Sequence, residues 1–392
     1  MKVLVQNVRV VSPDLDIDRA SVLVQDGKIQ AVLRLGQMVP AAEKVIDGRG
    51  QILMPGFIDI HTHGAAGADV CEGTEEAVRT IAKAKLQEGV TIFLPTTITA
   101  PNATLSQAMQ GVKAYQQRMD YAKTPSVHIE GPFINADCAG AQNPDFVRNP
   151  NWEELKHLHE IAPVGVVSIA VETEGAMTFT EQASSAGIVV SGAHSNATYM
   201  EFLQAKNKGL GHLTHFCNQM TPVHHREIGL VGAGLLDDDI KLELICDGVH
   251  LNRDMIKLIF KSRSVDGLML ITDSVAASWC PDGIRDFGGL QVEVKDGVAR
   301  LESGALAGST LKFNDGLKMV RSVTGLPLKE LVKTTSWNQA QSLGLEGVGK
   351  IEKGYAADFV LLDEELNIQS TFVDGVEKFT KEQTEQRKQH LA

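Results

Sequence analysis

A short apolar run that ends in two histidines constrains the fold of this chain more than any other feature. The run from Ile58 to Ile60 has the composition of a buried strand, and His61 and His63 follow it one residue apart. Because alternate residues of an extended strand project to the same face, both imidazoles can point at one metal ion. Functional side chains at the C-terminal ends of strands are typical of (β/α)₈ barrels. The motif therefore predicts a barrel strand that delivers metal ligands.

Seven further apolar runs have the length of buried strands, and several end in residues that can bind a metal ion. The runs are Thr91 to Pro95, Val127 to Ile129, Val164 to Ala170, Gly187 to Ala193, Leu210 to Thr214, Leu242 to Cys246 and Leu268 to Thr272. The potential ligands that follow them are Glu130, His194, His215 and Asp273. Eight buried strands that alternate with helical stretches predict an α/β fold with a parallel (β/α)₈ TIM barrel.

The two ends of the chain differ from its middle. Residues 1–53 contain short alternating strands separated by Asp-Gly turns, and residues 350–376 repeat that pattern. We expect both ends to build one small β-sandwich domain from residues 1–53 and 350–380, beside a barrel of residues 54–349. The polar tail from Glu377 to Ala392 is expected to be a solvated helix or a frayed end.

Charge and composition exclude some classes of partner. The 392 residues carry a net charge of −12 without a basic stretch, so we expect no nucleic acid partner. No apolar run reaches about 18 residues, and we expect neither a membrane span nor a signal peptide. The five cysteines are scattered and show no CxxC spacing, so reduced thiols in the cytoplasm are the simplest interpretation.

Longer motifs around these residues carry a family resemblance over nearly the whole chain. They include residues 55–63 (PGFIDIHTH), 128–133 (HIEGPF), 140–144 (GAQNP), 192–194 (GAH), 214–220 (THFCNQM), 225–227 (HRE), 247–250 (DGVH), 272–274 (TDS), 306–309 (LAGS) and 354–358 (GYAAD). The chain thereby resembles the amidohydrolase superfamily and, within it, the N-acetylglucosamine-6-phosphate deacetylase family. The first motif, Thr272-Asp273 and the last are similar to the superfamily at large, and the others to the deacetylases.

The candidate ligands define one metal site and the resemblance implies a second. One carboxylate and two imidazoles form the three-ligand set of a catalytic zinc with an open position for water: Glu130, His194 and His215. His61 and His63 would hold a second ion, with Glu130 reaching both, so we expect one or two divalent ions per subunit. Zn²⁺ is the first choice, although Fe²⁺, Co²⁺ and Mn²⁺ suit the same ligands. Two strand histidines are expected in the core instead: His128 and His212.

Asp273 is the candidate for proton transfer. Metal coordination brings the pKa of bound water from about 15.7 towards 7, and a nearby carboxylate can then take its proton. The same side chain can return the proton to the leaving amine, which leaves poorly as an anion. Asp273 could instead be a plain metal ligand or a helix N-cap.

The resemblance also implies the residues that bind the substrate. His250 and Arg226 correspond to residues that contact sugar and phosphate, and Asn218 and Gln219 lie where the family meets the phosphate. Arginine suits phosphate because its planar fork binds two oxygens. The other implied contacts are Gln142, where many relatives have His, and Leu306. The family implies a homodimer, in which Arg226 can serve the neighbouring subunit's site.

Three functions remain open. The preferred one is metal-dependent hydrolysis of the acetamide of N-acetyl-D-glucosamine 6-phosphate, a small phosphorylated amino sugar, to glucosamine 6-phosphate and acetate. The second is deacetylation of the galactosamine epimer, or hydrolysis of a cyclic amide or N-acyl amino acid; Glu130 in place of a carboxylated lysine counts against the latter two. The third is a non-catalytic scaffold, which would be expected to lose ligands that this chain retains.

Overall fold

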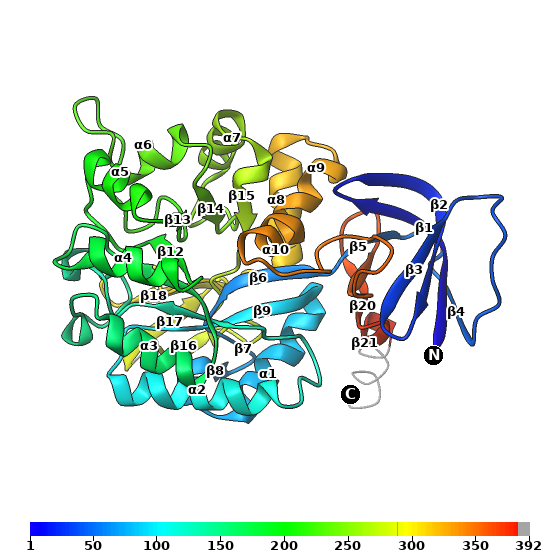
Figure 1. The fold of residues 1–392 in the computed structure, drawn as a ribbon, viewed down its shortest axis with the longest axis horizontal. Coiled ribbons are helices and arrows are strands. Elements are labelled where there is room, and N and C mark those ends of the chain that lie inside the picture. Colours follow the sequence, from blue (N-terminus) through cyan, green and yellow to red (C-terminus); the bar gives the residue numbers. More distant parts are fainter. Residues whose placement is uncertain (288, 383–392) are drawn as a thin grey trace.

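A nearly closed barrel of eight parallel strands dominates the computed structural model, which describes residues 1–287 and 289–382 (Figure 1). In spatial order from one edge the strands are β6 (Phe57–Thr62), β9 (Val90–Thr97), β10 (Val127–Glu130), β11 (Val164–Ile169), β12 (Val189–Gly192), β13 (Leu210–Leu213), β14 (Lys241–Leu244) and β15 (Leu268–Leu270). The barrel closes beyond β15, where the Asp273 amide donates to the His61 carbonyl at 2.9 Å and Thr62 pairs with Ser274. The expected barrel is therefore confirmed.

Helices follow the barrel strands in alternation. They are α1 (Glu75–Lys85), α2 (Asn102–Gln116), α3 (Trp152–Ile161), α4 (Ala176–Ser185), α5 (Tyr199–Asn207), α6 (Gly229–Leu236), α7 (Arg253–Ser262) and α8 (Phe313–Thr324). Helix α1 illustrates their local causes: the Thr74 side chain accepts from the Ala77 amide as N-cap, and Val78 and Ile81 bury one face. The strands between the helices are buried on both faces, as a parallel sheet requires.

Strands from both chain ends form a second, mixed sheet beside the barrel, at the right of Figure 1. They are β1 (Lys2–Ser12), β2 (Leu15–Gln25), β3 (Lys28–Leu33), β4 (Lys44–Asp47), β5 (Ile52–Pro55), β19 (Phe359–Leu362), β20 (Ile368–Val373) and β21 (Val376–Thr380). Strand β5 joins the two ends, because it pairs parallel with β1 and antiparallel with β19. The expectation that both termini build one small β-sandwich domain beside the barrel is confirmed in that strands from both ends share a sheet, which is mixed.

The C-terminal tail departs in part from the expectation. Residues 377–380 belong to β21, which pairs with β20, and Phe379 packs against the hydrophobic core. The prediction of a solvated helix or frayed end is therefore wrong for these residues, because the apolar Phe379 provides a reason to pair. Residues 383–392 lie outside the described part of the chain.

A three-stranded antiparallel sheet, absent from the sequence prediction, follows the last barrel strand. It consists of β16 (Gly283–Phe287), β17 (Leu290–Lys295) and β18 (Val298–Leu301). Val292, Val294 and Phe287 of this sheet pack with Val275 and Ala307 in a hydrophobic cluster of their own. The sheet thereby lies against the segments that follow β15, close to the C-terminal ends of the barrel strands.

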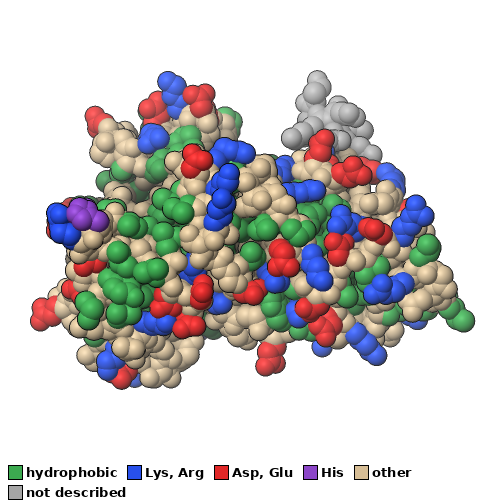
Figure 2. Space-filling view, turned by 90° about the horizontal axis from the view of Figure 1, so that it is seen from above, with side chains coloured by type: hydrophobic (Ala, Val, Ile, Leu, Met, Phe, Trp, Pro, Cys, Tyr) green, Lys and Arg blue, Asp and Glu red, His purple; other side chains and the backbone are tan. Residues whose placement is uncertain are grey.

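The remaining elements are short. They are β7 (Gly64–Ala65), β8 (Ala68–Asp69), α9 (Leu328–Val332), α10 (Asn338–Ser342), a π-helical turn at Lys333–Trp337, and 3₁₀ turns at Val70–Glu72, Leu86–Glu88, Ala136–Cys138, Pro144–Phe146 and Val265–Gly267. Within residues 1–287 and 289–382, none of the helices has the length and apolar character needed to cross a bilayer. On the face drawn in Figure 2, basic and acidic side chains are interspersed.

Candidate metal centre and active site

Three candidate site residues leave their strands in a left-handed backbone conformation. His194, His215 and Asp273 have φ values of 46°, 34° and 50°, a region that side chains other than glycine seldom adopt. Each lies within three residues of the C-terminal end of a barrel strand. Strain of this kind costs roughly 1–3 kcal/mol and gathers at functional sites. The strained backbone at these three positions therefore turns their side chains toward the mouth of the barrel at a cost in folding stability.

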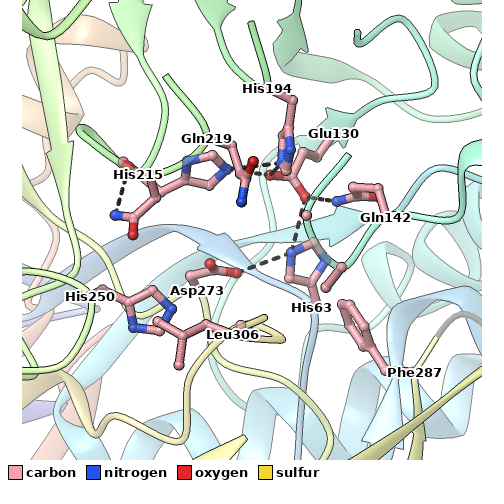
Figure 3. A pocket seen from close by; sticks show the side chains of 14 residues that line it. His63, Glu130, Gln142, His194, His215, Gln219, His250, Asp273, Phe287 and Leu306 are labelled. Carbon is pink, nitrogen blue, oxygen red and sulfur yellow. Dashed lines mark hydrogen bonds and ion pairs between the residues drawn. The ribbon is translucent and has the colours of Figure 1, made fainter. Parts of the chain in front are cut away.

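Glu130 lies at the centre of the convergent side chains (Figure 3). Its Oε1 atom is 2.9 Å from His215 Nε2 and 3.4 Å from His194 Nε2, and its Oε2 atom is 3.3 Å from His63 Nε2. The same His63 Nε2 atom is also 3.2 Å from Asp273 Oδ1. Glu130 Oε1 also lies 3.6 Å from His61 Nε2, so this one carboxylate contacts histidines of both candidate metal groups. Such a carboxylate can be shared between two metal sites.

Hydrogen bonds behind two of the histidines decide which ring nitrogens face inward with a lone pair. His194 Nδ1 is 2.8 Å from the Cys138 carbonyl, and His63 Nδ1 is 3.2 Å from the Thr96 carbonyl. A carbonyl can only accept, so each Nδ1 carries a hydrogen, and Nε2 is the nitrogen whose lone pair is free in the neutral ring that binds a metal. The inward Nε2 atoms nevertheless lie 3.2 Å from another imidazole Nε2, that of His215 and His61 respectively. Lone pairs that converge in this way suit a metal ion.

The electrostatics of the site are those of a buried, strongly coupled carboxylate and imidazole cluster. Although burial raises the pKa of Glu130, the electrostatic interaction with the His61 imidazole and hydrogen bonds to His194 and His215 hold it well below its usual value. Burial lowers the pKa of His63, yet contacts with Asp273 and Glu130 raise it to about 10, so a metal ion bound there would displace the Nε2 proton. The pKa of His61 is lowered by burial. Glu130 therefore stays ionised, as a metal ligand must.

Among the residues that the structure describes, buried His, Asp and Glu side chains form three groups that could each hold a metal ion: His61, His63 and Asp273; Glu130, His194 and His215; and His61, His128 and Glu243. The first two groups contain the predicted ligands. The residues present thus fit one or two ions with nitrogen and oxygen ligands. His128, in the third group, is fully buried and hydrogen-bonded at both nitrogens, to the Ile60 carbonyl at 2.9 Å and Ser168 Oγ at 2.7 Å. It has the contacts expected of a core histidine.

A cavity of about 140 Å³ opens in front of these ligands. Five of the six predicted substrate contacts line it: Gln142, Asn218, Gln219, His250 and Leu306. Figure 3 shows His250 and Leu306 on the side of Asp273, and Gln142 and Gln219 nearer to Glu130. The small volume and the polar lining suit a compact hydrophilic ligand rather than a large apolar one.

Gln142 is engaged within the protein at both ends of its amide. Its Oε1 atom accepts from the Thr99 amide at 2.7 Å, and its Nε2 atom donates to Glu130 Oε2 at 2.6 Å. The backbone amide can only donate, which fixes the orientation of the side chain. Gln142 is therefore a support for Glu130 as well as part of the cavity wall.

His250 and Asn218 are held in place by neighbouring groups. His250 Nδ1 donates to Asp247 Oδ2 at 2.7 Å, and although burial raises the pKa of Asp247, this bond holds it below its usual value. Because Nδ1 is committed to Asp247, Nε2 is the ring nitrogen of His250 that is left for a ligand. Asn218 donates to the His215 carbonyl at 3.0 Å and so is tied to a candidate ligand.

Arg226 is the one predicted substrate contact that does not line this cavity. It lies on an exposed loop and its guanidinium Nη1 is 2.8 Å from His225 Nε2. The structure of one chain therefore does not bring Arg226 to the site of that same chain. This placement leaves the expectation that it serves a neighbouring subunit as a prediction.

Sequence reasoning did not identify several residues that shape the site. Phe287 lines the cavity and packs edge-on to His63, with ring centroids 5.5 Å apart. No sequence signal marks it, because the sheet that carries it was not predicted. Glu243 is wholly buried on β14, where burial raises its pKa to about 7. A lone acidic residue within the apolar run from Leu242 to Cys246 could have drawn attention to it.

A buried ion pair supports the site from below. Lys85 Nζ lies 2.9 Å from Asp59 Oδ2 and 3.0 Å from Glu88 Oε2, and all three residues are wholly buried. Asp59 Oδ1 accepts from the Thr272 amide at 3.1 Å and so connects β6 to the residue before Asp273. Metal-binding side chains gathered at the C-terminal ends of barrel strands are typical of metal-dependent (β/α)₈ barrel enzymes.

Known proteins share this fold and much of this sequence. The amidohydrolase family model matches residues 52–379. An N-acetylglucosamine-6-phosphate deacetylase of Lysinibacillus sphaericus is 35% identical over 379 residues, covering 96% of this chain and 97% of the relative. An N-acetylgalactosamine-6-phosphate deacetylase of Escherichia coli O157:H7 is 34% identical over 363 residues, covering 92% and 94%.

A solved structure agrees with these relatives along the whole chain. The crystal structure of N-acetylglucosamine-6-phosphate deacetylase from Thermotoga maritima superposes with a TM-score of 0.88 at 38% identity, covering 96% of this chain and 100% of the other. The chain belongs to the amidohydrolase family and, within it, to the N-acetylglucosamine-6-phosphate deacetylases.

Proposed function

We propose that this chain hydrolyses the acetamide of N-acetyl-D-glucosamine 6-phosphate to glucosamine 6-phosphate and acetate, as the names of its relatives suggest. The observation that carries the proposal is the convergence on Glu130 of histidines from three different strand ends, with Asp273 beside them at the mouth of a cavity. This arrangement places acid–base and metal-binding groups around one small volume, as amide hydrolysis requires.

The metal would be held by this chain's own side chains in two groups. Glu130, His194 and His215 would hold the principal ion, and His61 and His63 with Asp273 would hold a second. Zn²⁺ is the proposed metal, because three nitrogen and oxygen ligands with an open position are typical of catalytic zinc. When bound, a divalent ion supplies Lewis acidity, which acidifies water and polarises a carbonyl oxygen.

Asp273 carries the proton in the proposed reaction. Its carboxylate lines the cavity and its Oδ1 atom is 3.2 Å from His63 Nε2. It takes a proton from the water that attacks the acetamide carbonyl carbon. It then donates that proton to the nitrogen of the amino sugar as the carbon–nitrogen bond breaks. The products are acetate and the free amine.

The cavity wall binds the sugar and directs its phosphate outward. His250 Nε2 accepts from a sugar hydroxyl, because its Nδ1 is committed to Asp247. Asn218, Gln219 and Leu306 line the same cavity. No arginine or lysine lines it among the described residues, so a cation from outside the cavity is needed for a dianionic phosphate.

Arg226 of a second subunit is the proposed source of that cation. The arginine lies on an exposed loop outside its own chain's cavity, where a neighbouring chain can reach it. We therefore propose that the protein is a homodimer. We also propose that it works in the cytoplasm. Mixing an Arg226→Ala chain with an Asp273→Asn chain should restore part of the activity that each loses alone, because one of the two sites in the mixed dimer has both residues intact.

Acetate release from a panel of four substrates tests the proposed function. The panel contains N-acetylglucosamine 6-phosphate, its galactosamine epimer, unphosphorylated N-acetylglucosamine and an N-acetyl amino acid. A charged hydrogen bond to phosphate contributes roughly 1.5–3 kcal/mol, so the phosphosugar should exceed the free sugar in kcat/KM by about 10-fold or more per contact. Equal use of the phosphorylated and free sugars would refute the assignment.

The galactosamine epimer is the second candidate substrate. A relative that is 34% identical carries that name, while one that is 35% identical carries the glucosamine name, so identity alone does not separate the two. The two sugars differ only in the orientation of one hydroxyl. A higher kcat/KM for the galactosamine phosphosugar in the same panel would assign the chain to that epimer.

A further inference from the structure

A buried carboxylate on β14 has no place in the reaction described above. Glu243 is wholly buried, and its side chain lies between His212 of β13 and His61 of β6. Its Oε1 atom is 3.1 Å from His212 Nδ1, while its Oε2 atom has no hydrogen-bond partner in the described part of the chain. A buried polar atom left without a partner costs roughly 1–3 kcal/mol, so its position calls for an explanation.

An unpartnered ring nitrogen close to this oxygen belongs to a candidate metal ligand. His61 Nδ1 is also buried and also lacks a hydrogen-bond partner among the described residues, and it lies 3.5 Å from Glu243 Oε2. The other nitrogen of that ring faces the metal site, where His61 Nε2 is 3.5 Å from Asp273 Oδ1 and 3.2 Å from His63 Nε2. The two orphaned atoms are therefore complementary, one a donor and one an acceptor.

His63, the neighbouring candidate ligand, already has a hydrogen-bond acceptor behind its ring. His63 Nδ1 is 3.2 Å from the Thr96 carbonyl, and His63 Nε2 faces the site. A ligating imidazole almost always donates its second N–H to an acceptor behind it, which fixes the tautomer and raises the basicity of the ligating nitrogen. His61 has no carbonyl in that role, and Glu243 Oε2 stands in its place.

We propose that Glu243 is a positioning residue of the metal centre: it accepts the His61 Nδ1–H hydrogen bond and so directs His61 Nε2 toward the ion held with His63 and Asp273. The other oxygen of Glu243 is held by His212, whose imidazole is neutral because burial lowers its pKa to about 3. Neutral His212 donates from Nδ1 and anchors the carboxylate in the direction of His61. This inference rests on the metal centre of the proposed function.

A metal ion bound directly by Glu243, His61 and His128 is the competing interpretation, since these three form a compact buried group. The hydrogen bonds of His128 argue against it. Its Nδ1 must donate to the Ile60 carbonyl, and its Nε2 then accepts from Ser168 Oγ. His128 therefore has no free lone pair to offer an ion, and Glu243 is left as a hydrogen-bond acceptor rather than a ligand.

Equilibrium dialysis of Zn²⁺ against metal-free protein tests the proposal without any substrate. Loss of a carboxylate behind a ligating histidine typically weakens metal binding by about 10- to 100-fold. Glu243→Leu should therefore weaken one of two Zn²⁺ equivalents by that factor and leave the other, held by Glu130, His194 and His215, at its wild-type affinity. Glu243→Gln should fall between, because the amide presents its oxygen to only one of the two histidines that face different oxygens of Glu243.

Two further variants separate positioning from a general loss of structure. In a His61→Ala background, adding Glu243→Leu should cause no further change in Zn²⁺ binding, because the ligand that Glu243 supports is already gone. Asp358→Asn, a change at a buried carboxylate paired with Lys123 beside the terminal sheet, is the matched control and should leave both equivalents unchanged.

Four results would overturn the proposal. They are wild-type affinity in Glu243→Leu, equal weakening of both equivalents, a further loss in the His61→Ala background, and a wild-type chain that binds a single ion whose affinity does not depend on Glu243. Unchanged far-ultraviolet circular dichroism and retention of the equivalent at Glu130 show that the variants are folded. Because dialysis uses no sugar, failure of the deacetylase assignment would appear in the acetate assay alone.

Discussion

Replacing Gln142 with leucine should weaken metal binding although Gln142 is not itself a predicted ligand. The side chain is 5% exposed, and it bridges the Thr99 amide and Glu130 Oε2. Leucine has a similar size but no polar atoms. The change therefore removes the donor that holds one oxygen of Glu130 and leaves the Thr99 N–H buried without a partner.

The magnitude follows from these two contacts. A hydrogen bond to a charged group contributes roughly 1.5–3 kcal/mol, and each 1.4 kcal/mol is about tenfold in an equilibrium constant. If that support acts on the ionised, metal-binding form of Glu130, Zn²⁺ affinity should fall by about 10- to 150-fold. The orphaned Thr99 amide should lower the free energy of unfolding of the metal-free protein by roughly 1–3 kcal/mol.

Equilibrium dialysis and thermal unfolding of metal-free protein measure the two effects separately. Gln182→Leu, an equivalent change on the exposed face of α4, is the control and should alter neither. A Gln142→Leu protein that binds Zn²⁺ like wild type, with only the KM for the sugar raised, would refute the reasoning. Gln142 would then be a substrate contact alone, as the sequence resemblance implied.

Three further predictions address the proton carrier, the buried ion pair and the response to pH. Asp273→Asn should retain the Zn²⁺ held at Glu130 but lower kcat by about 10²- to 10⁴-fold; near-normal turnover in a rapid-quench or acetate assay would remove Asp273 from the mechanism. Lys85→Met should lower the free energy of unfolding by about 3–5 kcal/mol, because two carboxylates lose their buried counter-charge; a denaturant titration with an unshifted midpoint would contradict this. Because the pKa of Asp247 is lowered in the folded chain, the stability it adds is complete above its unfolded pKa and is lost as pH falls through the folded value. The difference in Tm between wild type and Asp247→Asn should accordingly be larger at pH 7 than at pH 3. A difference that stays constant would show that the charge of Asp247 does not stabilise the folded chain.

The barrel could be predicted from the sequence because its strands are buried on both faces. Continuous apolar runs such as Val164 to Ala170 stand out from their polar surroundings, and each one coincides with an observed strand, here β11. The sheet β16–β18 was missed because its strands alternate between exposed and buried residues and pack on a small cluster of their own. Nothing local in that segment indicates that it folds back over the barrel mouth.

The candidate ligands could be placed because strand ends of a parallel barrel meet at one rim. The contacts behind them could not, because they join residues far apart in the chain. Glu243 and His61 are separated by 182 positions, the difference of their numbers, and their approach depends on barrel curvature rather than on either local sequence. Arg226 shows the converse: its motif resembles that of a substrate contact, but in the structure of the single chain the side chain lies on the surface.

The most direct test of the account titrates Zn²⁺ into metal-free wild-type protein while acetate release from N-acetylglucosamine 6-phosphate and bound metal are measured together. If Glu130, His194 and His215 form the catalytic centre, activity should be absent without metal and should rise in proportion to the ion bound at that site. A His194→Ala, His215→Ala double variant should bind less metal and remain inactive at every concentration of Zn²⁺. Full deacetylation by protein that holds less than about a twentieth of an equivalent of metal would contradict the account, since metal activation of water is its central step.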